Sequence, residues 1–264
     1  MNEQTRRRLG TLALCLGLAA LHFILLLTAV HWVGTDAALY YSLQTQGGEQ
    51  YSWDTEMLFS VSQEDLKMLD GCLADYLKGN EGALDVTVSV YGTPREAFND
   101  QEKAHMADCL YLFDLLRKVR ARLIPWIIVL ILGGAWLLQD RKRARLCAWL
   151  SPLIVLVPLI AFAVCAILNF DRAFTLFHKI LFRNDLWLLD PTTDLLIRLC
   201  PQYMFVRMGV RIALYSLLSI AMATLFAVVL TYEWPKGKEE NPWKTTTRRA
   251  PAPRQYDFGS RAKR

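Results

Sequence analysis

The motifs that mark several common enzyme classes are missing from this 264-residue chain. It has no H-E-x-x-H pair, no G-x-S-x-G elbow, no P-loop and no dinucleotide-binding glycine fingerprint. Its six cysteines are scattered and include no C-x-x-C pair. We therefore expect neither a zinc site nor a disulfide framework, and we interpret the cysteines, Cys72, Cys109 and Cys200 in particular, as free thiols.

Long apolar runs are what the chain does have, and 53% of its residues are hydrophobic. This proportion indicates a few membrane spans combined with a sizeable polar part. The first run follows Arg6, Arg7 and Arg8, is longer than a signal-peptide core and lacks a small-x-small cleavage site, so we interpret it as an uncleaved helix. The predicted fold is mainly α-helical and integral to the membrane, with four transmembrane helices of about 20 residues.

The polar segments between the runs define the predicted domain plan. Ser62 begins a helix pattern that Gly79 ends, and Val88 lies in an alternating strand pattern, which together predict a small mixed α/β extracytoplasmic domain. A second helix is predicted to begin near Asn99 and to continue into the second span, with a kink at Pro125. The predicted boundaries are 1–33 for the N-terminus and first span, 34–122 for the domain, 123–138 for the second span, 139–145 for a basic cytoplasmic turn, 146–168 for the third span, 169–208 for a shorter extracytoplasmic loop with catalytic residues, 209–231 for the fourth span and 232–264 for a disordered basic cytoplasmic tail.

The distribution of charge predicts the orientation of the chain. The N-terminus, the 139–145 turn and the tail carry 3, 4 and 9 Lys or Arg residues, whereas the 34–122 segment carries 8 together with 15 acidic residues. Because short basic segments stay on the cytoplasmic side, both termini are predicted to be cytoplasmic and the two large loops extracytoplasmic. The same distribution argues against nucleic acid as a partner.

Two histidines, His105 and His178, lie in these outer segments. Glu102 and Asp108 stand three residues before and after His105, which makes them its neighbours on the predicted helix, where an acid can fix the tautomer of an imidazole and raise its basicity. Each feature alone is more typical of a solvated charged helix or an interfacial histidine than of a functional site, and the aspartates around Pro191 are typical of a turn and a helix cap. Two histidines on the same side of a short protein favour a shared site.

Two stretches resemble the signatures of a bacterial family of four-span membrane proteins that includes the lipoprotein intramolecular transacylase. Glu102-x-x-His105-Met106-x-Asp108 is similar to the first signature, E-x-x-H-M-x-D. The positions similar to the second are Phe177, His178, Phe182, Trp187, Asp190, Pro191, Asp194, Leu196, Ile197 and Pro201. Lys179, Leu181 and Cys109 differ from residues common in the family, whereas both signature histidines are present. The resemblance extends to about residue 231.

This resemblance implies an acyltransferase in the plasma membrane of a bacterial cell envelope. Such an enzyme moves the sn-2 acyl chain of a diacylglyceryl lipoprotein to the α-amine of its N-terminal cysteine and leaves the lyso-form. The implied partners are that lipoprotein and membrane lipids, and no cofactor is needed. We assign His105 as the base and His178 to the oxyanion or the leaving oxygen, and the two roles are interchangeable. Supporting roles are expected for Glu102, Asp108, Asp190, Asp194 and Trp187.

Two other functions remain open. A non-enzymatic lipoprotein-binding or scaffold protein would tolerate substitution of both histidines. A metal-dependent membrane hydrolase would bind zinc through histidine and aspartate and would be sensitive to chelators.

Overall fold

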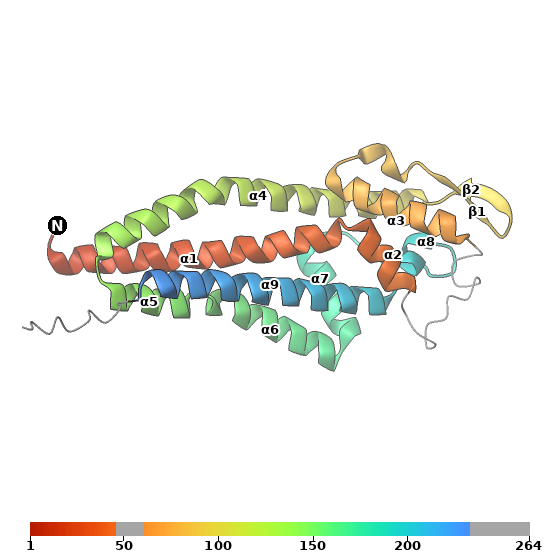
Figure 1. Ribbon diagram of the computed structural model, residues 1–264. Coiled ribbons are helices and arrows are strands. Elements are labelled where there is room, and N and C mark those ends of the chain that lie inside the picture. The colour runs from red at the N-terminus through yellow and green to blue at the C-terminus, as the bar shows by residue number, and fades with distance from the viewer. Residues whose placement is uncertain (46–60, 233–264) are drawn as a thin grey trace, which may run out of the picture. The chain divides into compact units, whose positions relative to one another are not determined.

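The computed structural model describes residues 1–45 and 61–232 (Figure 1). The predicted disordered tail therefore lies outside the described residues, apart from Tyr232. Four helical stretches are long and apolar enough to cross a membrane, namely α1 (Glu3–Gly34), α4 (Asp100–Leu138), the stretch Arg141–Leu168 and α9 (Gln202–Leu230). The predicted mainly helical, multi-pass architecture is confirmed at this level.

The third stretch differs from its prediction because it consists of two helices, α5 (Arg141–Leu150) and α6 (Leu153–Leu168). Pro152 lies at the junction, where its missing N–H would leave a continuous helix short of one hydrogen bond. The basic residues predicted as a turn over 139–145 instead begin α5, and Asp140 caps this helix by accepting a hydrogen bond from the Arg143 N–H at 3.1 Å.

Helix α1 lies between α4 and α9 (Figure 1). Glycines allow the α1 and α4 backbones to approach closely, as is common between membrane helices. A Cβ atom added at Gly134 would lie 2.6 Å from the backbone nitrogen of Leu14, and one at Gly10 would lie 2.5 Å from that of Leu138. On its other side, α1 contacts α9 through a hydrogen bond of 3.2 Å between His22 Nε2 and Thr224 Oγ1.

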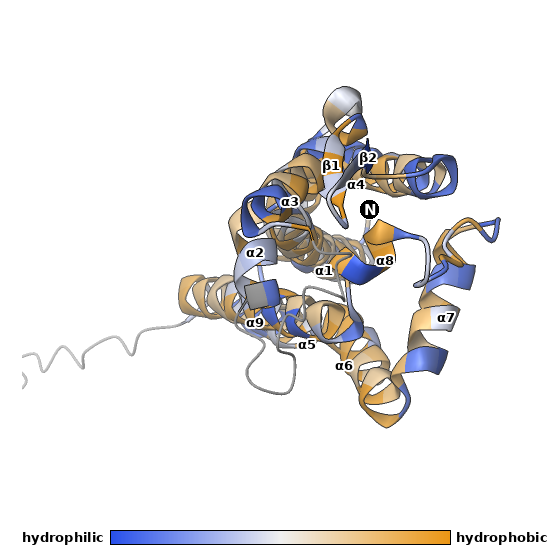
Figure 2. Ribbon diagram, turned by 90° about the vertical axis from the view of Figure 1, so that its right-hand side faces the viewer, coloured by the Kyte–Doolittle hydropathy of each residue, from blue (hydrophilic) through white to orange (hydrophobic). Residues whose placement is uncertain are grey.

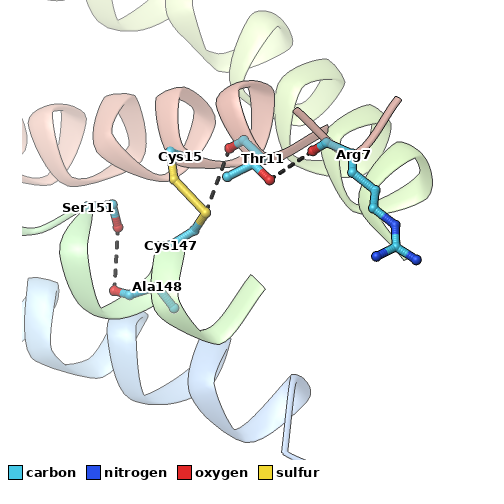
Figure 3. Close-up of a disulfide and its surroundings, with 6 residues drawn as sticks. All are labelled: Arg7, Thr11, Cys15, Cys147, Ala148 and Ser151. Atoms are coloured by element: carbon cyan, nitrogen blue, oxygen red, sulfur yellow. Dashed lines mark hydrogen bonds between the residues drawn. A yellow bond between two sulfur atoms is a disulfide. The ribbon is translucent and has the colours of Figure 1, made fainter. Parts of the chain in front are cut away.

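Cys15 of α1 and Cys147 of α5 form a disulfide (Figure 3). The expectation that all cysteines are free is therefore wrong for this pair. The two residues are separated by 132 positions and meet only because α5 packs on α1, which no local pattern reveals. Among the described residues, the remaining four cysteines are free, and these include Cys72, Cys109 and Cys200, as predicted.

The segment between α1 and α4 contains α2 (Ala37–Thr45), α3 (Gln63–Lys78), a 3-10 turn η2 (Glu81–Leu84), β1 (Thr87–Val90) and β2 (Thr93–Glu96). The predicted caps of α3 are confirmed, because Ser62 accepts a hydrogen bond from the Asp65 N–H at 3.0 Å and Gly79 ends the helix with φ of 112°. The predicted strand is also present. It is β1, which is followed by a left-handed turn at Tyr91 and Gly92 and pairs antiparallel with β2.

The segment between α6 and α9 contains α7 (Phe170–Leu181) and α8 (Leu195–Leu199), and α9 begins well before the predicted residue 209. Leu195 and Leu199 of α8 are completely buried and share one hydrophobic core with Leu69 of α3 and Phe98. The segment between α1 and α4 and the segment between α6 and α9 therefore share one core, which allows residues distant in the sequence to form a site.

Candidate active site

His105 is positioned by the N-terminus of α4. Asn99 and Glu102 form a capping box there, in which each side chain accepts the backbone N–H of the other, at 3.0 and 2.7 Å. The imidazole follows one turn after Glu102 and is 9% exposed. Four basic residues between 117 and 122 separate this turn from the apolar part of α4, so His105 lies outside the apolar stretch of the helix.

His178 lies near the end of α7, where its Nδ1–H donates to the Phe174 carbonyl oxygen at 2.8 Å. Because a carbonyl oxygen can only accept, this bond places the ring proton on Nδ1 and leaves the lone pair of the neutral imidazole on Nε2. The ring is packed against Phe174, Phe177 and Trp187, with ring centroids 4.0, 5.3 and 4.8 Å away.

The structure brings the two histidines together, with ring centroids 6.1 Å apart. Phe182 contacts both rings, at centroid distances of 5.2 Å from His105 and 5.5 Å from His178. Burial, followed by the nearby His178, lowers the pKa of His105 to about 4. Burial also lowers the pKa of His178. Both imidazoles are therefore neutral near pH 7, which is the state in which a histidine can accept a proton.

Glu102 supports the site in a different way from the one expected. Its Oε1 accepts the Leu196 N–H at 2.6 Å, and its Oε2 accepts the Asn99 N–H at 2.7 Å. Both oxygens of this 1% exposed carboxylate thus bind backbone amides instead of the His105 imidazole. Glu102 therefore connects the start of α4 with the start of α8, the two segments that carry the signatures.

Asp108 faces the segment between α6 and α9, where it accepts a hydrogen bond from the Asn184 side chain at 2.9 Å. Its charge acts in the direction that raises the pKa of His105, although burial and His178 outweigh it. The next turn of α4 places Cys109 Sγ 3.7 Å from His105 Nε2.

Asp194 and Asp190 shape the turn before α8. Asp194 accepts the Asn99 side-chain N–H at 2.9 Å with one oxygen and the Asp190 backbone N–H at 2.7 Å with the other. Asp190 is exposed and accepts the Thr192 backbone N–H at 2.7 Å. Trp187 precedes this turn, and its indole N–H donates to the Asn184 carbonyl oxygen at 3.0 Å. These residues hold the loop and the aromatic wall of His178 in place.

The sequence interpretation did not include Asn99, Asn184 or Phe174 in the site. Asn99 had a local signal, since it precedes a glutamate by three residues at a helix start. Asn184 and Phe174 had none, because their contacts depend on the tertiary structure. Within residues 1–45 and 61–232, no three His, Cys, Asp or Glu side chains are grouped as the ligands of a metal ion would be.

Comparison with known proteins defines the family. No curated protein matches the chain. The solved structure of the membrane integral lipoprotein intramolecular transacylase Lit from Bacillus cereus is similar, with 22% identity and a TM-score of 0.60 over 85% of this chain and 93% of that chain. Structures of two variants of that protein, with one histidine replaced by arginine or by alanine, match with TM-scores of 0.55 and 0.57 at the same identity, over 85% of this chain and over 90% and 93% of theirs. These likenesses show the fold.

The family model described as lipoprotein intramolecular transacylase Lit matches residues 15–205. This range covers most of the chain and contains both histidines, the capping box of α4 and the turn before α8. The chain therefore belongs to the lipoprotein intramolecular transacylase family, Lit.

Proposed function

We propose that this protein transfers the sn-2 acyl chain of a diacylglyceryl lipoprotein to the α-amine of that lipoprotein's N-terminal cysteine. The observation that carries the proposal is the pair of buried neutral imidazoles, His105 and His178, 6.1 Å apart in a chain of this family. The solved relative from Bacillus cereus is named as a lipoprotein intramolecular transacylase. The substrate supplies both the nucleophile and the acyl donor.

The reaction needs a proton to move between two substrate atoms. The amine nitrogen attacks the ester carbonyl, the bond from the carbonyl carbon to the glyceryl oxygen breaks, and an amide forms. One proton leaves the amine and one is gained by the glyceryl oxygen, so the reaction balances without a co-reactant. Because amine and ester belong to one molecule, binding them in a reactive geometry removes much of the entropic barrier.

The hydrogen bonds favour the exchanged assignment of the two histidines. His178 donates its Nδ1–H to the Phe174 carbonyl, so Nε2 accepts the amine proton and returns it to the leaving oxygen. His105, whose low pKa keeps it neutral, donates an N–H to the tetrahedral oxyanion. The Phe182 ring, in contact with both, excludes water from the pair.

The reaction takes place at the extracytoplasmic face of the plasma membrane in this proposal, with both termini in the cytoplasm. The basic residues at the start of α5 and at the N-terminus support this orientation. Helix α7 carries both hydrophobic and hydrophilic residues (Figure 2). Leu176 and Ile180 are exposed and apolar, whereas Lys179 is charged, so this helix would lie along the interface between membrane and water. The lipid part of the substrate can then approach His178 from the bilayer.

The test is tandem mass spectrometry of the N-terminal peptide of a reporter lipoprotein, expressed with this protein in a host that lacks N-acylation. Intact mass is uninformative because an intramolecular transfer conserves it, so fragment ions must locate each acyl chain. We expect an acyl group on the cysteine nitrogen with the wild type, and its loss with His105→Ala or His178→Ala. His31→Gln, on α1, is the matched control and retains activity. Both chains remaining on glycerol despite normal wild-type expression would refute the proposal.

A further inference from the structure

Cys109 contacts the His105 imidazole from the same helix, α4. The residues are four positions apart, which places them on one face of α4, and Sγ lies 3.7 Å from Nε2. The other ring nitrogen, Nδ1, is buried and has no hydrogen-bond partner among the described residues. The thiol therefore makes the one polar contact that the described structure gives this imidazole.

The Cys109 thiol and the His105 imidazole are both neutral, so one hydrogen atom lies between Sγ and Nε2. Burial raises the pKa of Cys109 to about 12, and burial lowers that of His105 to about 4. An imidazole nitrogen accepts hydrogen bonds well, whereas a thiol sulfur accepts them weakly. Among the described contacts, His105 Nε2 is the acceptor within reach of the Cys109 S–H. An S–H that donates to Nε2 requires the ring proton to lie on Nδ1.

His178 and His105 then hold the same tautomer but offer opposite groups. In His178 the Nδ1–H is used by the Phe174 carbonyl, so the lone pair on Nε2 remains available. In His105 the lone pair on Nε2 is used by the thiol, so the Nδ1–H, which surrounding atoms bury in the unliganded structure, is the donor left without a protein partner among the described residues. One ring presents an acceptor and the other a donor, which are the two groups that an acyl transfer requires.

We propose that Cys109 is a positioning residue that keeps His105 in its Nδ1–H tautomer and so makes it a hydrogen-bond donor to the oxyanion. This inference rests on the proposed function and assigns a part of its mechanism. The thiol bond orients the histidine and does not itself take part in the acyl transfer. Its removal should weaken catalysis without abolishing it.

The direct test is nitrogen-15 NMR of the purified full-length protein with labelled histidine. The chain has four histidines, and His105→Gln identifies the signals of His105. We expect a protonated Nδ1 and a bare Nε2 in the wild type. Cys109→Val, similar in shape but without a donor, gives a mixture of tautomers, whereas Cys109→Ser, with a hydroxyl donor, retains the wild-type form. Cys72→Val, at a half-buried cysteine of α3, leaves the spectrum unchanged.

Turnover supplies a second readout that loss of packing alone does not reproduce. Cys109→Val should lower kcat about two- to tenfold, the range of one net hydrogen bond, with KM unchanged, and Cys109→Ser should restore it. A wild-type spectrum with the proton on Nε2, or one that Cys109→Val leaves unchanged, would overturn the inference. The spectrum needs no turnover, so the two proposals can fail separately. If the protein is inactive on lipoprotein but shows the predicted tautomer, the proposed reaction is refuted and the thiol bond is confirmed.

Discussion

The indole ring of Trp187 stacks on the imidazole of His178, with centroids 4.8 Å apart and planes inclined by 30°. The indole N–H donates to the Asn184 carbonyl oxygen, which fixes the plane of the stack. Trp187 is 9% exposed, so it acts as a wall of the site and shields the histidine from water.

Trp187→Ala should lower kcat about tenfold or more. The substitution removes an aromatic pair worth about 0.5–1.5 kcal/mol beyond its burial, and it hydrates His178. Trp187→Phe should retain most of the activity because it keeps the stack. Trp126→Ala is the control, since this tryptophan of α4 is 65% exposed and contacts neither histidine. Equal losses in Trp187→Phe and Trp187→Ala would show that the stack itself does not matter.

Activity should rise with pH across the acidic range. Protonation of His178 removes the lone pair that accepts the substrate proton in the proposed mechanism, and its lowered pKa places this loss below the ordinary value of about 6.5. The substrate amine, with an ordinary pKa of about 7.7–8.0, extends the rise above neutrality. The profile of kcat/KM between pH 5 and pH 9 measures both limbs. A rate that increases as the pH falls from 7 to 5 would contradict the assignment of neutral histidines.

The free energy of unfolding should also rise with pH across the acidic range, because of His105. In the unfolded chain this histidine binds a proton below about pH 6.5, whereas in the folded protein it does so only below about 4. Between these values the unfolded state holds more protons, so the free energy of unfolding falls as the pH falls, by about 3 kcal/mol at most. Melting temperatures of the wild type and His105→Gln from pH 7.5 to pH 4.5 should diverge in slope, and parallel curves would count against a depressed pKa.

Glu102→Gln should destabilise the protein by about 1–3 kcal/mol. The glutamine side chain has a single oxygen, so it cannot accept from both the Asn99 and the Leu196 N–H groups. Loss of these bonds should also lower kcat. Because the Glu102 oxygens bind backbone amides and not the imidazole, the acidic limb of the pH profile should stay at the same pH. Asp100→Asn, an exposed position on the same turn, serves as the control in thermal unfolding. A displaced acidic limb would instead indicate that Glu102 acts on His105 directly.

Two adjacent glycines of α4 offer a matched pair for the packing of the membrane helices. An added Cβ at Gly134 would meet the Leu14 backbone at 2.6 Å, whereas at Gly133 it would meet nothing within 4 Å. Gly134→Ala should cost about 1–3 kcal/mol through displacement of α1, and Gly133→Ala should be neutral or slightly stabilising. Melting temperatures of the purified variants make the comparison. Similar values would mean that α1 and α4 do not approach at this point.

Local features of the fold could be predicted from the sequence because their causes are local. The cap of α3 at Ser62, its stop at Gly79 and the start of α4 after Asn99 each depend on residues within one turn. The four apolar stretches depend on length and composition alone. The break at Pro152 was missed because an apolar run can conceal the end of one helix and the start of the next.

Long-range contacts could not be predicted in this way. The Cys15–Cys147 disulfide and the bond from Glu102 to the Leu196 amide depend on how helices pack, and the spacing E-x-x-H suggested a different partner for Glu102. The pairing of His105 with His178 was expected from their predicted location on one side of the membrane and from the family signatures, since no periodicity relates an α4 residue to an α7 residue. Their distance and the Cys109 contact required the structure.

The bond between Glu102 and the Leu196 amide also sets a sequence of events during biosynthesis. The carboxylate is synthesised 94 residues before the amide that it binds. During translation, α4 therefore carries an acceptor without its final donor until α8 arrives. Because the same late segment brings His178 and its aromatic wall, the proposed histidine pair is complete only after α7 and α8 have been made.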